Sequence, residues 1–150
     1  PQKGGGPMGD LEWPFDESQI TDEYGPRDSP GGIGSTFHRG IDFGAPEGSS
    51  IKAAGSGTVV ERGTGVVGGT GFGNFVTIEH SGGKRTLYAH MQSASPYNIG
   101  DGVAKGATVG PIGNTGSSTG PHLHLEVHVR QTDGSWLQVN PRDVIKKPWS

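Results

Sequence analysis

The sequence predicts an all-β domain built mainly from antiparallel sheet, with long loops that form a groove and with minimal helix. Three observations lead to this prediction. Apolar and polar residues alternate with a period of two in several segments, which are rich in β-branched and aromatic residues. Sequences typical of tight turns separate neighbouring segments. The chain of 150 residues contains 29 glycines, which favours a small domain with many turns.

The chain is expected to hold one domain. Its 150 residues and 15.5 kDa suit a single modest core. The first residues, PQKGGG, are rich in glycine, so residues 1–19 are expected to be a linker stub or N-terminal extension within a longer protein. Residues 20–150 form the predicted domain, and a monomer is the expected state for so small and polar a unit.

Four segments are predicted to be strands, at residues 58–62, 74–80, 84–90 and 122–130. The residues Ser81-Gly82-Gly83 between the second and third segments predict a hairpin turn, and Asp133-Gly134 predicts another after the fourth. We therefore expect adjacent strands to be antiparallel.

Two further segments have a different character. Residues 63–73 contain too much glycine for a core element and are expected to form a flexible loop at the edge of the sheet. Near the C-terminus, Asn140 offers a helix cap and Pro141 a proline for the first turn. Together they predict one closing helical turn at most, over residues 141–145.

The strongest element is the sequence HLHLEVHV at residues 122–129, where polar and apolar residues alternate without a break. In a strand, one set of side chains faces the core and the other faces away. The expected core set is Leu123, Leu125, Val127 and Val129, and the opposite set is His122, His124, Glu126 and His128. Neighbours within one set lie about 7 Å apart, which suits a metal ligand and a proton-handling residue at His122 and His124. His128 is about 13 Å beyond His124 and is expected to be a solvated strand residue.

His38 and Asp42 lie in the sequence FHRGID, and an extended strand would separate them by about 13 Å. No single metal ion could bind both in that conformation. Because Gly40, Ile41 and nearby Pro46 disfavour a helix, we expect the chain to bend at Gly40. His38 is then expected on a loop, and Asp42 at the start of an element.

Four histidines and one carboxylate thus fall in three short segments: His38 and Asp42, His90 in LYAH, and His122 and His124. Zinc prefers four tetrahedral partners, and a catalytic site leaves one position to water. Zinc lowers the pKa of that water from 15.7 to about 7, which provides a nucleophile at neutral pH. These residue types therefore indicate a zinc hydrolase with two proton-handling neighbours.

Composition argues against several other classes of protein and site. The chain contains no cysteine, so a metal must be held by nitrogen and oxygen and no disulfide framework exists. The net charge of −3 gives no sign of nucleic-acid binding. The sequence has no apolar run of membrane-spanning length and no signal-peptide pattern.

The segments HRGIDFGAP, LYAHM and TGSSTGPHLHLEV closely resemble those of the lysostaphin-type zinc endopeptidases, peptidase family M23. The resemblance runs from about Ile20 to Ile145 and includes ITDEYGPR, IKAAGSGTVV, GFGNFVTIEH and VNPRDVI. It implies the lysostaphin-type peptidase fold and cleavage of peptide bonds in bacterial cell-wall peptidoglycan. It leaves open whether the bond lies in a glycine bridge or a D-alanyl link.

The resemblance also implies roles for individual residues. His38, Asp42 and His124 would ligate one zinc ion, and His90 and His122 would act in catalysis. Some relatives use a tyrosine ahead of the first histidine, but Tyr24 is interpreted here as a packing residue. The implied location is the cell wall, the extracellular space or the periplasm, or the protein is encoded by a phage as an endolysin or virion component.

Three alternatives compete with this interpretation. The sequence GSSTG around Ser118 matches an esterase elbow, but no histidine follows Asp133 to complete its triad. The glycine pattern at residues 63–68 matches a dinucleotide fingerprint, but no helix follows it. The third alternative is a non-catalytic peptidoglycan-binding or regulatory module on the same scaffold. Relatives of that kind usually lack metal ligands, whereas this chain has all five site residues.

Overall fold

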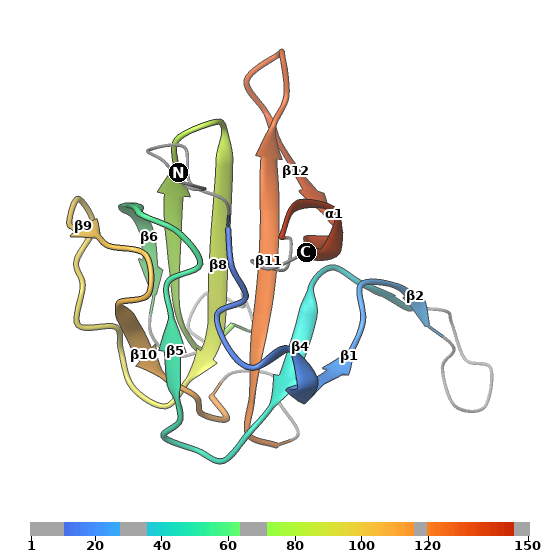
Figure 1. Ribbon diagram of the computed structural model, residues 1–150, viewed down its shortest axis with the longest axis vertical. Helices are drawn as coiled ribbons and strands as arrows, with labels where there is room; N and C mark the ends of the chain where they lie inside the picture. The colour runs from blue at the N-terminus through green and yellow to red at the C-terminus, as the bar shows by residue number, and fades with distance from the viewer. Residues whose placement is uncertain (1–10, 28–35, 64–71, 116–119, 146–150) are drawn as a thin grey trace, which may run out of the picture.

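The computed structural model describes residues 11–27, 36–63, 72–115 and 120–145 (Figure 1). These residues form an all-β structure, as predicted, with mostly antiparallel strands and two short helical segments. In chain order the elements are η1 (Glu17–Gln19), β1 (Ile20–Asp22), β2 (Gly25–Arg27), β3 (Thr36–His38), β4 (Ile41–Gly44), β5 (Ser50–Lys52), β6 (Gly57–Gly63), β7 (Asn74–His80), β8 (Lys84–Met91), β9 (Gly102–Val103), β10 (Thr108–Pro111), β11 (His122–Arg130), β12 (Trp136–Val139) and α1 (Pro141–Val144).

One large sheet organises the molecule. Its strands follow the order β1-β4-β11-β8-β7-β6-β9, and β12 pairs with the C-terminal part of β11. Two small sheets, β5 with β10 and β2 with β3, complete the described strands. In Figure 1, β5 and the N-terminal segment cross in front of the large sheet. The large sheet therefore has one covered face and one face that remains available for a site.

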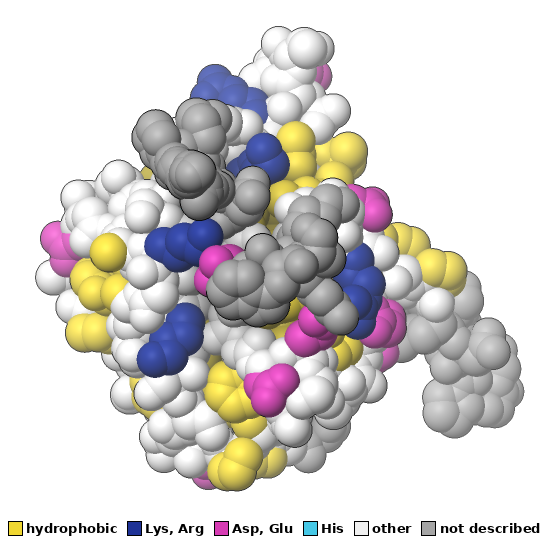
Figure 2. Space-filling model, viewed as in Figure 1, with side chains coloured by type: hydrophobic (Ala, Val, Ile, Leu, Met, Phe, Trp, Pro, Cys, Tyr) yellow, Lys and Arg dark blue, Asp and Glu magenta, His cyan; other side chains and the backbone are white. Residues whose placement is uncertain are grey.

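The core lies on the covered face. Alternate residues of the central strands are fully buried there, and apolar residues of β5, β10 and the N-terminal segment pack against them. Burial of this apolar surface is the main force that holds the layers together. The largest of these fully buried residues are Tyr88, Phe43, Ile41, Ile51, Ile78, Met91, Ile112, Leu123 and Leu125. Figure 2 views the molecule from this covered side, and no histidine is seen among its coloured residues.

The regular alternating patterns predicted the strands correctly. The predicted strands at residues 74–80 and 122–130 are β7 and β11, and those at residues 58–62 and 84–90 lie within β6 and β8. The residues Ser81-Gly82-Gly83 form the turn between β7 and β8, with Gly82 and Gly83 at positive φ. Residues 131–135 connect β11 to β12 through a turn at Asp133-Gly134. The closing helical turn is α1, whose Asn140 cap accepts a hydrogen bond from the Arg142 backbone.

The first third of the chain holds one expected segment that packs closely and one expectation that differs from the structure. Residues 11–19, expected to belong to a linker stub or N-terminal extension, pack on the domain: Leu11 is buried, and Trp13 and Phe15 contact the Phe43 ring edge-on. Their apolar side chains cover one end of the core. His38, expected on a loop, ends strand β3 and pairs with Gly25 of β2. The chain bends only after His38, at Gly40.

Other expectations fall on residues that the structure does not describe. Most of the expected loop at residues 63–73, together with the glycine pattern that begins it, lies outside the described residues, as does Ser118. Within the described part of the chain, no helix has the length and apolar character needed to cross a membrane.

Candidate metal and catalytic site

The bend at Gly40 brings His38 and Asp42 together. His38 ends β3, the chain turns, and Asp42 follows on β4 between the fully buried residues Ile41 and Phe43. As a result, the Nε2 atom of His38 lies 3.2 Å from Oδ1 of Asp42. An extended chain would hold His38 and Asp42 far apart, and the predicted bend at Gly40 brings them together.

Strand pairing supplies the third ligand candidate. β4 and β11 are antiparallel, and their register places His124 directly opposite Asp42. The Nδ1 atom of His124 lies 2.8 Å from Oδ1 of Asp42. One potential ligand atom from each of His38, Asp42 and His124 lies within 4.8 Å of the other two. The predicted metal ligands therefore form one cluster, on the face of the sheet opposite the core.

The outer contacts of the two imidazoles fit a metal site. His38 donates from Nδ1 to the Glu23 carbonyl oxygen at 2.8 Å, which leaves Nε2 facing Asp42. His124 donates from Nε2 to Oε2 of Glu126 at 2.9 Å, which leaves Nδ1 facing Asp42. Metal-ligating histidines usually have this arrangement, with the second nitrogen bonded to a carboxylate or carbonyl oxygen. Two nitrogen donors and one carboxylate are a common catalytic zinc set.

The three groups also shift each other's protonation. Burial alone would raise the pKa of the Asp42 carboxyl, but hydrogen bonds from His124 and His38 hold it well below its usual value. Burial alone would lower the pKa of His124, but its bonds to Asp42 and Glu126 raise it to about 9. The pKa of His38 is raised because its bonds to Asp42 and Glu23 outweigh burial. A charged carboxylate between two imidazoles is thus the stable arrangement.

His90 and His122 lie beside this cluster. Their ring centroids are 4.8 Å apart, and that of His90 is 6.0 Å from that of His124. The Nε2 atom of His122 lies 4.0 Å from Oδ2 of Asp42. His90 has φ of 64°, the only positive φ of a non-glycine residue in the described segments. Such strained backbone persists where surrounding contacts enforce it and is common at functional sites.

Backbone carbonyl groups fix both of these rings. His90 donates from Nδ1 to the Thr115 carbonyl oxygen at 2.6 Å, and His122 donates from Nδ1 to that of Gly120 at 2.8 Å. In each ring, Nδ1 is thus assigned as a hydrogen-bond donor, and Nε2 is the second ring nitrogen. Burial lowers the pKa of His90 and outweighs its bond to Thr115, so a neutral ring is favoured at neutral pH.

Sequence reasoning missed several residues that support the site. Thr115 holds the His90 ring through its carbonyl and also donates from Oγ1 to the Met91 carbonyl oxygen at 2.7 Å. Nothing in the sequence marked this loop threonine. Glu126 was expected on the polar face of β11, where it lies, but its burial and its bond to His124 were not foreseen. The only available signal was its place in the alternation with the histidines.

Two other expectations about this face have different outcomes. His128, expected to be solvated, is mostly buried and bonds through Nε2 to Oε1 of Glu126 at 2.9 Å, with Gln138 of the paired strand β12 directly opposite it. Val129, expected in the core, is only half-buried at the hairpin end of β11. Tyr24 packs edge-on against Phe37 with centroids 5.1 Å apart, consistent with a packing residue.

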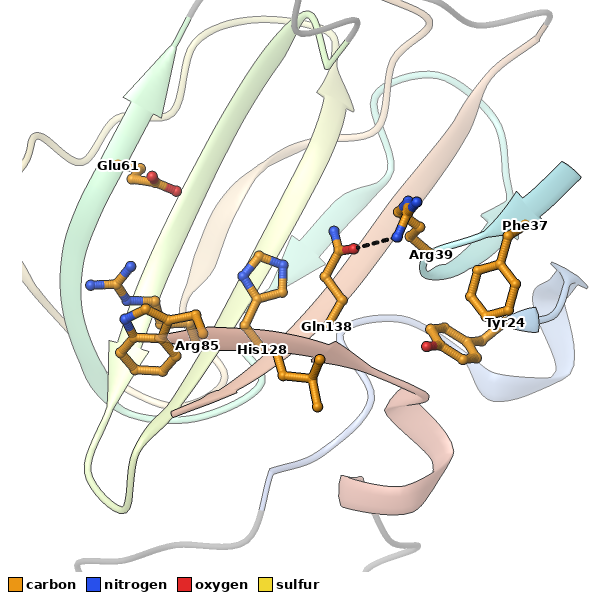
Figure 3. A pocket seen from close by; sticks show the side chains of 9 residues that line it. Tyr24, Phe37, Arg39, Glu61, Arg85, His128 and Gln138 are labelled. Carbon is orange, nitrogen blue, oxygen red and sulfur yellow. Dashed lines mark hydrogen bonds between the residues drawn. The ribbon is translucent and has the colours of Figure 1, made fainter. Parts of the chain in front are cut away.

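A groove lies on the face of the sheet that carries His128, a residue of the same strand as His124 (Figure 3). Its volume is about 740 Å³. Arg39, next to metal-ligand candidate His38, lines one part of it and donates to Gln138, while Glu61 lies at the opposite end in Figure 3. The remaining lining residues are Tyr24, Phe37, Arg85, His128, Trp136 and Leu137.

Similarity to known proteins agrees with this geometry. Residues 36–141 match the model of peptidase family M23. The chain is 36% identical to the peptidoglycan DD-endopeptidase ShyC of Vibrio cholerae over 135 residues, which are 89% of this chain and 29% of that protein. It is 41% identical to lysostaphin of Staphylococcus simulans over 126 residues, 82% of this chain and 24% of lysostaphin. The chain therefore spans less than a third of these relatives.

Solved structures give the same result. The catalytic domain of the prophage-encoded M23 protein EnpA from Enterococcus faecalis, crystallised as a point mutant, matches with a TM-score of 0.71 and 32% identity, over 87% of this chain and 95% of that one. The catalytic domain of lysostaphin from Staphylococcus simulans matches with a TM-score of 0.69 and 33% identity, over 83% and 89%. With the matched family model, these likenesses show that the chain belongs to peptidase family M23.

Proposed function

We propose that the protein is a zinc-dependent endopeptidase that hydrolyses peptide bonds in bacterial cell-wall peptidoglycan. The observation that carries this proposal is the cluster of His38, Asp42 and His124 with two further imidazoles beside it. Membership of family M23 supports it, as do relatives named peptidoglycan DD-endopeptidase and lysostaphin. The site of action would be the cell wall, reached from the periplasm, from outside the cell or by a phage.

His38, Asp42 and His124 would hold one zinc ion. When bound, zinc supplies a water nucleophile at neutral pH and polarises the scissile carbonyl group. The roles left to the other residues are to move a proton and to stabilise negative charge. We assign these to His90 and His122, whose Nδ1 atoms are bonded to carbonyl groups and whose Nε2 atoms are the remaining ring nitrogens.

A neutral imidazole accepts a proton from the attacking water, and a protonated imidazole donates a hydrogen bond to the developing oxyanion. The lowered pKa of His90 favours its neutral form. The two rings, 4.8 Å apart, lie close enough to act on the two sides of one reacting carbonyl group. The substrate peptide would lie in the groove that residues of β11 and β12 line together with Arg39, the residue after His38.

The proposal is tested with purified cell walls. We expect their turbidity to fall when the protein is added, to stop falling with a chelator, and to fall again when zinc is restored. The variants His90→Ala and His122→Ala should each retain one zinc ion and lose roughly 10² to 10⁴ of the rate, the usual contribution of a general acid or base. Binding to walls without release of peptide fragments would instead favour a non-catalytic module.

A further inference from the structure

Glu126 is a buried carboxylate beside the candidate metal site. Its side chain lies on the same face of β11 as His122 and His124, yet it is only 3% exposed. A buried carboxylate is costly unless its oxygens are hydrogen-bonded. Both oxygens of Glu126 accept hydrogen bonds. The partner of one oxygen is a candidate metal ligand, and the partners of the other line the groove.

One oxygen of Glu126 bonds to His124, one of the three candidate metal ligands. Oε2 accepts a hydrogen bond from Nε2 of His124 at 2.9 Å. The other ring nitrogen of His124, Nδ1, points at Asp42. This bond therefore fixes the orientation of the His124 ring and decides which of its nitrogens is left for a metal ion.

The other oxygen bonds to two residues that line the groove. Oε1 accepts from Nε2 of His128 at 2.9 Å and from Nε2 of Gln138 at 2.8 Å. Gln138 in turn accepts from Arg39 at 3.3 Å, a bond drawn in Figure 3, where His128 lies beside Gln138. Because these donors occupy Oε1, the carboxylate cannot rotate away from His124 without losing two bonds.

We propose that Glu126 is the positioning residue for metal-ligand His124, and that His128 and Gln138 hold it in place. The bond from His124 to Glu126 keeps Nδ1 of His124 directed at the ion. The negative charge of Glu126 makes the imidazole more basic and so a stronger metal ligand. This inference rests on the proposed function, because it needs His124 to ligate the metal. It makes β12 a functional part of the site, through Gln138.

A purely structural role is the competing explanation. In that case Glu126 would only tie β11 to β12, and its loss would lower thermal stability without changing the metal site. Metal affinity separates the two roles, since a merely structural bond would not move it in protein that remains folded.

The test compares zinc affinity in the wild type and Glu126→Gln, by competition with a chelating dye well below the unfolding temperature. We expect a roughly 10- to 100-fold weaker affinity, the usual effect of removing an outer partner of a ligating histidine. The matched control is Glu79→Gln, which removes another hydrogen-bonded carboxylate of the same sheet, one bound to Arg85. Its zinc affinity should stay within threefold of the wild type.

If Glu126→Gln does not fold, as judged by circular dichroism, Glu126→Asp takes its place. It keeps the charge but is one methylene shorter, so it should lose the bond to His124 and also bind zinc at least tenfold more weakly. Wild-type affinity in the folded variant overturns this inference and leaves the proposed function intact. Failure of the wild type itself to bind zinc overturns the proposed function instead.

Discussion

At the scale of single residues, Gly40 determines whether the candidate metal ligands His38, Asp42 and His124 can meet. A Cβ atom at this position would lie 2.2 Å from the Leu125 carbonyl oxygen and 3.0 Å from Cε1 of the His124 ring. The first neighbour is backbone, so it cannot move aside as a flexible side chain can. Only glycine allows the turn after His38 to approach β11 this closely.

Gly40→Ala is therefore expected to push the turn away from β11. We expect a loss of roughly 1–3 kcal/mol in the free energy of unfolding, the usual cost of forcing extra atoms into packed structure. Zinc affinity should fall as well, because the turn carries His38 to Asp42. Urea unfolding and zinc competition measure the two effects. Gly102→Ala is the matched control, since nothing lies within 4 Å of its Cβ position; equal stability of both variants would contradict this account.

At the scale of elements, a chain of buried polar groups links β7, β8 and the segment before β6. His80 donates from Nδ1 to the Ser56 carbonyl oxygen at 2.8 Å, and its Nε2 lies 2.8 Å from Oγ1 of Thr86. Thr86 contacts the Tyr88 hydroxyl at 2.6 Å, which accepts from the Ala54 backbone at 2.9 Å. Every group finds a partner when the Nε2 atom of His80 is an acceptor, so the neutral ring fits.

This chain predicts a loss of stability in acid. Burial lowers the pKa of His80 below 6.5 and outweighs its bond to Ser56. As the pH falls below 6.5, the unfolded chain binds a proton that the folded protein does not, so the free energy of unfolding decreases. The contribution is complete above pH 6.5 and is lost toward the lower pKa of the folded state.

In His80→Gln, which keeps a donor and an acceptor, this part of the pH dependence should be absent. Urea unfolding at about pH 7.5 and about pH 5.5, on either side of the ordinary histidine pKa and under identical metal conditions, measures it. The variant should lose less stability between the two pH values than the wild type. An equal loss would show that His80 does not contribute.

The elements themselves were predictable where a pattern was long and regular. The strand at residues 74–80 matched β7, because alternation is bounded there by a Ser-Gly-Gly turn. β3 was not foreseen, because it is short and follows a segment rich in glycine and serine. The burial of Glu126 was not foreseen either, because alternation gives the face of a side chain but not the partners, such as Gln138 of β12, that surround it.

At the scale of the whole molecule, the site depends on the order of strands in the sheet, which the local patterns of one sequence do not reveal. Asp42 meets His124 only because β4 pairs in one register with β11, a strand far away along the chain. A shift by one residue would turn Asp42 toward the core. The clustering of His38, Asp42 and His124 was nevertheless predictable from the resemblance to family M23, since its spaced motifs indicate residues that converge in the fold.

The arrangement of the sheet also predicts how the substrate is held. The groove has the exposed guanidinium of Arg39 toward one end and Glu61 toward the other (Figure 3). No ion pair joins Arg39 to a carboxylate among the described residues, where its side chain bonds to Gln138 and lies over the Phe37 ring. This charge is therefore available to a carboxylate of a bound peptide.

We expect Arg39→Gln to raise KM about fivefold for peptide substrates with a free carboxylate, since an exposed charged contact is worth about 1 kcal/mol. The change in kcat should be smaller, because Arg39 is not one of the groups assigned to proton transfer. Amidated peptides should show little change. Lys52→Gln, which removes an exposed charge from β5, serves as the control. Steady-state kinetics on both peptides measures the effect, and an equal rise in KM for the two would mean that Arg39 does not read the carboxylate.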